Sequence, residues 1–125
     1  MSEVGELVGK TPTRIDGGVG DHEVTIHCSD GSAFQFYFDD EDTGNDVTIR
    51  LEDLGGGSLE ELIGHKILLA EMASRKGARD KESGRDSTTW TFVKLRSHGG
   101  NVTMRWYGAS NGYYAEYPLF RRVSA

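Results

Sequence analysis

Hydrophobic residues recur at every second position along much of the chain. Three phenylalanines alternate with other residues over positions 34–38, and a valine, a methionine and a tryptophan do the same over positions 102–106. A period of two is typical of half-buried antiparallel strands. The residues Asp30-Gly31 and Gly99-Gly100-Asn101 precede these stretches and suit tight turns with positive φ. The pattern therefore predicts a mainly β protein built from hairpins.

A short motif occurs twice and divides the chain into two related halves. Glu6-Leu7-Val8-Gly9-Lys10 returns as Glu61-Leu62-Ile63-Gly64-His65. Each copy opens the same succession of extended segment, turn, alternating strand, glycine-containing turn and last strand. We therefore predict an internal duplication with pseudo-two-fold symmetry. The first half is expected over about 6–52, a linker over 53–58, and the second half over about 59–122.

Each copy of the motif is also expected to form a short helix. The clearer one follows Ser58, which with Glu61 would form a capping box, and Gly64 would end it. The predicted fold class is mainly β (α+β), with about eight antiparallel strands and two short helices in a single domain, 1–125. The expected core positions are Phe34, Phe36, Phe38, Ile49, Leu69, Phe92, Met104 and Trp106.

The segment Ser74–Ser87 stands outside the alternating pattern. Its only apolar residue is Ala78, and it carries five basic and three acidic side chains. The composition predicts a solvated hairpin loop. A basic flap over a site is the alternative, because long loops in compact domains often serve a function.

Composition and charge narrow the class of protein. Hydrophobic residues are 36% and charged residues 27% of 125 residues, which suits one globular domain. A lone cysteine, Cys28, excludes an intrachain disulfide, and no apolar run suggests a signal peptide or a membrane span, so we expect a cytoplasmic protein without a membrane partner. The net charge is −6. Thirteen acidic and three basic residues fall in 1–57, so we expect no direct DNA binding.

Familiar catalytic and metal-binding patterns are absent from the sequence. The acidic run Asp39–Asp46 does not fit an EF-hand, and a solvated turn is expected there. The four histidines are not at metal-ligand spacing from one another, and no nucleophile elbow, phosphate-binding loop or dinucleotide fingerprint occurs. We therefore assign no catalytic residue, no metal and no cofactor.

One segment combines aromatic side chains with hydrogen-bond donors. On the alternating strand Trp106 points to the core, while Arg105 and Tyr107 point the other way. Aromatic faces beside arginine can stack a base and hold a phosphate, and the same groups also form hot spots for protein partners. The alternative is that the tyrosines complete the core and decorate the sheet. The predicted ligand-binding residues are Arg105, Tyr107, Ser110, Asn111, Tyr113 and Tyr114.

These residues carry a resemblance to a known kind of domain. Leu62-Ile63-Gly64, Ile67–Glu71, Trp90-Thr91-Phe92 and Val102–Tyr114 resemble an uncharacterised domain common in bacteriophage and prophage genomes. The chain departs from that pattern in the acidic turn after Phe38, where a histidine- and cysteine-containing segment would be expected. The resemblance implies a phage origin and a place in the host cytoplasm, but no activity. By analogy, small phage domains without catalytic motifs often act against host defence.

Three functions are compatible with these observations. The leading hypothesis is a non-catalytic phage-type binding protein that sequesters a small anionic ligand, such as a nucleotide signal, in counter-defence. The first alternative is an inhibitor that binds a host defence protein through the acidic first half. The second alternative is a nucleotide-processing enzyme. A homo-oligomer is compatible with each of them.

Overall fold

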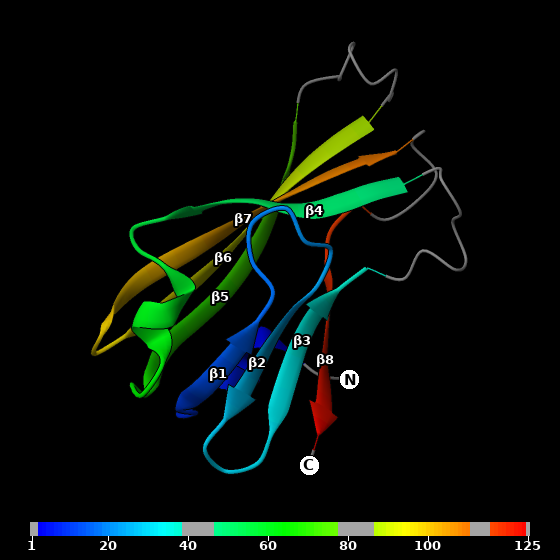
Figure 1. The fold of residues 1–125 in the computed structure, drawn as a ribbon. Coiled ribbons are helices and arrows are strands. Elements are labelled where there is room, and N and C mark those ends of the chain that lie inside the picture. Colours follow the sequence, from blue (N-terminus) through cyan, green and yellow to red (C-terminus); the bar gives the residue numbers. More distant parts are fainter. Residues whose placement is uncertain (1–2, 39–46, 78–86, 111–115, 125) are drawn as a thin grey trace.

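The computed structural model describes residues 3–38, 47–77, 87–110 and 116–124. These residues form eight strands in two antiparallel sheets of four, as the alternating pattern predicted (Figure 1). No helix in this part of the chain is long and apolar enough to cross a bilayer. In chain order the elements are η1 (Val4–Leu7), β1 (Pro12–Asp16), β2 (Val24–Cys28), β3 (Ala33–Tyr37), β4 (Val47–Gly55), η2 (Leu59–Leu62), β5 (Ile67–Lys76), β6 (Ser87–Ser97), β7 (Gly100–Ser110) and β8 (Leu119–Ser124).

The two sheets exchange their last strands. One sheet has the order β1-β2-β3-β8 and the other has the order β4-β7-β6-β5. Each half of the chain therefore builds three strands of its own sheet and lends its fourth strand to the other sheet. The predicted hairpin turns join β2 to β3 and β6 to β7, with positive φ at Gly31 and Gly100.

The repeated motif has the same conformation in both halves. Leu7 and Leu62 are fully buried, and the glycines that follow have φ of 89° at Gly9 and 84° at Gly64. The Gly9 N–H donates to the Ile67 carbonyl at 2.8 Å, and the Gly64 N–H donates to the Pro12 carbonyl at the same distance. The two sheets have equivalent strand orders, and the two glycines make equivalent hydrogen bonds, as an internal duplication predicts. Common descent of the two halves stays a prediction.

The two expected short helices are not formed, because each copy of the motif forms only a single 3-10 turn of four residues. The side chain of Ser58 makes no capping hydrogen bond, so the predicted box with Glu61 is absent. Gly64 follows immediately and turns the chain toward β5, which leaves no length for a second helical turn. β4 continues through Gly55 and so takes up the first part of the predicted linker.

The hydrophobic core lies between the sheets. Five of the expected core residues are buried, namely Phe34, Phe36, Ile49, Met104 and Trp106, while Phe38 is partly buried against them. Two expectations were wrong. A bulge in β5 between Ile67 and Leu69 reverses the alternation of faces, so Leu69 lies on the outer face of its sheet. On β6, Phe92 lies on the outer face together with Lys94.

The predicted loop over Ser74–Ser87 is partly strand. Ser74, Arg75 and Lys76 continue β5, Ser87 begins β6, and the Gly77 N–H donates to the Thr88 carbonyl at 3.0 Å. Residues 78–86 lie outside the described residues.

Candidate ligand-binding site

The strand register places a row of cations and rings across the outer face of the β4-β7-β6-β5 sheet. Arg50 on β4 lies opposite Tyr107 on β7, Tyr107 lies opposite Trp90 on β6, and Trp90 lies opposite Arg75 on β5. Directly opposite residues project from the same face of an antiparallel sheet. With strands about 4.8 Å apart, the row spans about 14 Å.

The two rings in this row touch each other and are flanked by guanidinium groups. The ring centroids of Trp90 and Tyr107 are 5.0 Å apart, with planes inclined by 59°. The guanidinium carbon of Arg105 lies 4.7 Å from the Trp90 ring centroid, and that of Arg50 lies 5.0 Å from the Tyr107 centroid. Both arginines are within the range of cation–π attraction. We call Arg50, Trp90, Arg105 and Tyr107 the ring–guanidinium cluster.

Two carboxylates fix the arginines of the cluster. Arg105 donates from Nε to Asp53 Oδ1 at 2.9 Å and from Nη2 to Asp53 Oδ2, and Arg50 donates from Nε to Glu52 Oε2 at 2.8 Å. Both guanidinium side chains remain about 40% exposed (42% and 40%). A guanidinium carries five N–H donors, so these bonds orient each arginine and leave donors for an anion from solvent.

Gly77 sets the position of the tryptophan. A Cβ at this glycine would lie 3.0 Å from Cδ1 and 3.1 Å from Nε1 of Trp90, and 2.6 Å from Oγ1 of Thr88. The indole therefore packs against the backbone at the end of β5. This close approach holds one ring of the pair in a defined place on the sheet.

A second polar cluster lies at the same end of the sheet, on its inner face. Glu116 is only 3% exposed. Its Oε1 accepts from Thr89 Oγ1 at 2.7 Å, Ser87 Oγ at 3.0 Å and Lys76 Nζ at 3.2 Å, and its Oε2 accepts from Ser110 Oγ. Burial alone would raise the pKa of Glu116, but the four donors together outweigh it and hold the pKa below its ordinary value. Both carboxylate oxygens accept hydrogen bonds from within the chain, so Glu116 joins the segment that precedes β8 to strands β6 and β7.

Comparison with known proteins assigns the chain to a family. The model of a domain of unknown function, DUF7448, matches residues 5–120. The chain belongs to the DUF7448 family. The match to DUF7448 spans both halves, every residue of the ring–guanidinium cluster, and Glu116. No curated protein and no solved structure matches the chain.

The structure of this DUF7448 domain places three of the six predicted ligand-binding residues. Arg105 and Tyr107 lie outward and Trp106 is fully buried, which confirms the predicted orientation. Ser110 does not join them, because it is buried on the inner face and donates to Glu116. Asn111, Tyr113 and Tyr114 lie outside the described residues.

The sequence prediction missed Trp90 and Arg50. A signal for Trp90 existed: Trp90 and Phe92 alternate with the buried Thr91 and Val93, and share their face with the charged Lys94. Nothing in the sequence pairs Arg50 with Tyr107, because that contact depends on the exchange of β4 into the other sheet.

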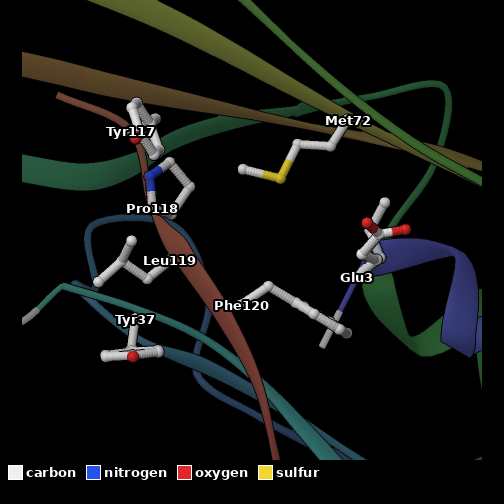
Figure 2. Close-up of a pocket in the computed structure, with 8 residues that line it drawn as sticks. Glu3, Tyr37, Met72, Tyr117, Pro118, Leu119 and Phe120 are labelled. Carbon is white, nitrogen blue, oxygen red and sulfur yellow. The ribbon is translucent and has the colours of Figure 1, made fainter. Parts of the chain in front are cut away.

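An apolar cavity of about 500 Å³ is lined by residues of η1, β3, β5 and β8 and of the segments that lead into η1 and β8. Figure 2 shows Met72 on one side of this cavity, with Tyr37 and Phe120 on the other. The described residues that line it include the carboxylate of Glu3 and no basic side chain. The cavity therefore suits an anionic ligand less well than the ring–guanidinium cluster does.

Other candidate chemistry finds no support in the described residues. Within 3–38, 47–77, 87–110 and 116–124, no three His, Cys, Asp or Glu side chains come together as metal ligands would. The acidic run Asp39–Asp46 lies outside these ranges. Cys28 is buried, and burial raises the pKa of its thiol, which disfavours the reactive thiolate.

Proposed function

We propose that this DUF7448 domain is a non-catalytic binding protein that holds a small anionic ligand with a planar base, such as a nucleotide, on the outer face of the β4-β7-β6-β5 sheet. The observation that carries the proposal is the ring–guanidinium cluster, in which Trp90 and Tyr107 touch and Arg105 and Arg50 lie over them. Half-buried rings beside oriented guanidinium groups are the chemistry with which proteins stack bases and bind phosphates.

The cluster suggests how such a ligand would bind. A base would stack against the indole of Trp90. Stacking of a base on an aromatic side chain contributes about 1–3 kcal/mol in comparable sites. The phosphate would accept hydrogen bonds from the donors of Arg105 and Arg50 that Asp53 and Glu52 do not use. These two carboxylates repel added negative charge, and the chain as a whole carries −6. A ligand with few phosphates is therefore favoured over a nucleic-acid strand.

The biological setting belongs to the same proposal. The motifs shared with phage and prophage domains support a phage protein that acts in the host cytoplasm. A binding protein without catalytic residues would act there by sequestration, and a nucleotide that signals infection is the ligand whose removal would benefit a phage. Sequestration of such a signal would make this domain a counter-defence protein.

Titration calorimetry tests the proposal with a panel of linear and cyclic nucleotides. We expect the wild type to bind at least one of them, and Trp90→Ala or Arg105→Gln to bind it about ten- to a hundredfold more weakly, since each change removes a stacking or charge-assisted contact. Arg96→Gln is the matched control, because Arg96 is an exposed arginine on β6 outside the cluster. Thermal melts of each variant check that the fold is intact.

Several outcomes would count against nucleotide binding. Absence of any binding to the wild type, or equal binding by Trp90→Ala and the wild type, would overturn it. Capture of a host protein in the absence of nucleotide binding would favour the inhibitor hypothesis. Chromatography of the nucleotide after incubation should return it unchanged, and its conversion to a product would favour a nucleotide-processing enzyme.

A further inference from the structure

In the part of the chain that the structure describes, β5 is the last strand of its sheet, and η1 packs against it. β5 ends the order β4-β7-β6-β5, and its exposed residues include Ala73, Arg75 and Lys76. Among the described residues, the backbone hydrogen bonds that reach β5 from outside its own sheet come from Gly9 and Lys10, and both meet Ile67. The opposite edge, β4, is bonded in its middle, where Leu51 exchanges hydrogen bonds with Gly20 and Asp21. An edge strand is a template for pairing with another strand.

Ala73 is a small, exposed residue of β5 on the C-terminal side of Ile67. Two copies can pair antiparallel about a two-fold axis at this residue. An axis perpendicular to the sheet also keeps the outer faces of both copies on the same side.

The charges on β5 select the same register. Glu71 and Arg75 both project from the outer face, opposite Lys94 and Trp90 of β6. With the axis at Ala73, Glu71 of each copy lies directly opposite Arg75 of the other, which makes two cross-strand ion pairs. An axis at Glu71 or at Arg75 would instead place like charges opposite each other. Among registers that keep the outer faces of both copies on the same side, the one with its axis at Ala73 pairs Glu71 with Arg75.

Side-chain size is complementary in this register as well. Leu69 would lie opposite Gly77, and Met72 opposite Ser74, so that each large residue meets a small one. At the axis two alanines face each other, which lets the two backbones approach to the normal spacing of strands.

We propose that this chain forms a homodimer by antiparallel pairing of β5 with β5 of a second copy, with the two-fold axis at Ala73 and reciprocal Glu71–Arg75 ion pairs. The result is one continuous sheet of eight strands. This proposal does not rest on nucleotide binding, since the position of β5 at the edge of its sheet, its charges and its side-chain sizes carry it.

Analytical ultracentrifugation over a range of concentrations tests the dimer. The wild type is expected to sediment as a dimer. Glu71→Arg and Arg75→Glu should each weaken the dimer by about tenfold or more, because each replaces two attractive pairs by two repulsive ones. The double variant Glu71→Arg with Arg75→Glu restores opposite charges across the axis, and should restore the dimer. Arg96→Glu changes the net charge by as much as Arg75→Glu, and should leave the dimer intact.

Each other outcome overturns the proposal. A wild type that stays monomeric at millimolar concentration excludes a functional β5 interface. A dimer that survives both single charge reversals is formed by another surface. If the double variant remains monomeric although its circular dichroism matches the wild type, the Glu71–Arg75 register is wrong.

Discussion

Glu116 offers the sharpest test of how the described fold is held together. Its carboxylate accepts hydrogen bonds from four side chains on β5, β6 and β7, and it lies in the segment that leads into β8. Two of the donors, Thr89 and Ser110, are themselves buried. Replacing Glu116 by alanine would remove this acceptor from two buried hydroxyls.

The magnitude follows from the burial of each donor. A buried donor left without a partner costs about 1–3 kcal/mol, which applies to Thr89, and the hydrogen bond that Ser110 donates to this carboxylate contributes about 1.5–3 kcal/mol more. The side chain of Lys76 is 74% exposed, so its bond to Glu116 adds little. We expect Glu116→Ala to lower the free energy of unfolding by about 3–5 kcal/mol. Glu116→Gln keeps one carbonyl acceptor, so its loss should be about 1–3 kcal/mol.

The effect should also depend on pH. Because the folded state lowers the pKa of Glu116 below its ordinary value of 4.5, the unfolded chain binds this proton more readily than the folded chain does. The stability that Glu116 contributes is therefore complete above about pH 4.5 and is lost as the pH falls through the lower folded value. The gap in stability between the wild type and Glu116→Gln should narrow over that range.

Urea unfolding followed by circular dichroism measures these differences at neutral pH and at steps into the acid range. Glu60→Gln is the control, because Glu60 is exposed on η2 and its replacement should change the stability by less than about 0.5 kcal/mol. A loss below about 1 kcal/mol for Glu116→Ala would show that the carboxylate is not the acceptor that holds these hydroxyls. A gap that stays constant with pH would refute the lowered pKa.

Two further substitutions test the packing between the sheets. Phe36→Ala should cost about 3–5 kcal/mol in urea unfolding, because Phe36 is fully buried against Phe120 and Trp106, and a loss below about 1 kcal/mol would mean that the site is not buried. Gly108→Ala should cost about 1–3 kcal/mol, because its Cβ would lie 1.9 Å from the Glu116 carbonyl oxygen. Gly55→Ala in the same sheet has nothing within 4 Å and should be nearly neutral, so equal losses at the two glycines would contradict the close approach.

The sequence predicted the strands, the hairpins and the repeated turns, because all three depend on local spacing. Alternation over 34–38 and 102–106 marks β3 and β7, and glycines mark the turns that need positive φ. It failed where the outcome depended on tertiary structure. The bulge after Ile67 reverses the facing of β5 without any sign in its composition. The error at Phe92 is of a different kind, because its alternation with Lys94 already indicates the outer face.

The candidate site was only partly predictable for the same reason. Arg105 and Tyr107 could be placed together on one face, since both flank the buried Trp106 on one strand. Their neighbours come from other strands. Trp90 reaches them across the β6–β7 hairpin, and Arg50 reaches them from the other half of the chain. No local pattern predicts which strand of the first half joins the second sheet.

That exchange of strands decides where the ring–guanidinium cluster lies. Equivalent inner positions of β3 and β7 are apolar in both halves, but the outer positions differ: Gln35 corresponds to Thr103, and Tyr37 to Arg105. On the outer face of the first sheet, the carboxamide of Gln35 is already engaged, because it accepts from Arg121 at 2.9 and 2.7 Å and donates to Glu23 at 2.7 Å. That face also carries a ring–guanidinium contact, since the guanidinium carbon of Arg121 lies 4.1 Å from the Tyr37 ring centroid.

The outer face of the second sheet differs in carrying two rings in mutual contact, each with its own guanidinium. Trp90, Tyr107 and Arg105 come from the second half, whereas Arg50 and the carboxylates of Glu52 and Asp53 come with β4 from the first half. Neither half contains both the ring pair and the carboxylates that orient its arginines. The ring–guanidinium cluster therefore forms only when β4 is paired with β7, so that the ligand binding proposed for this face would require the complete, strand-exchanged fold.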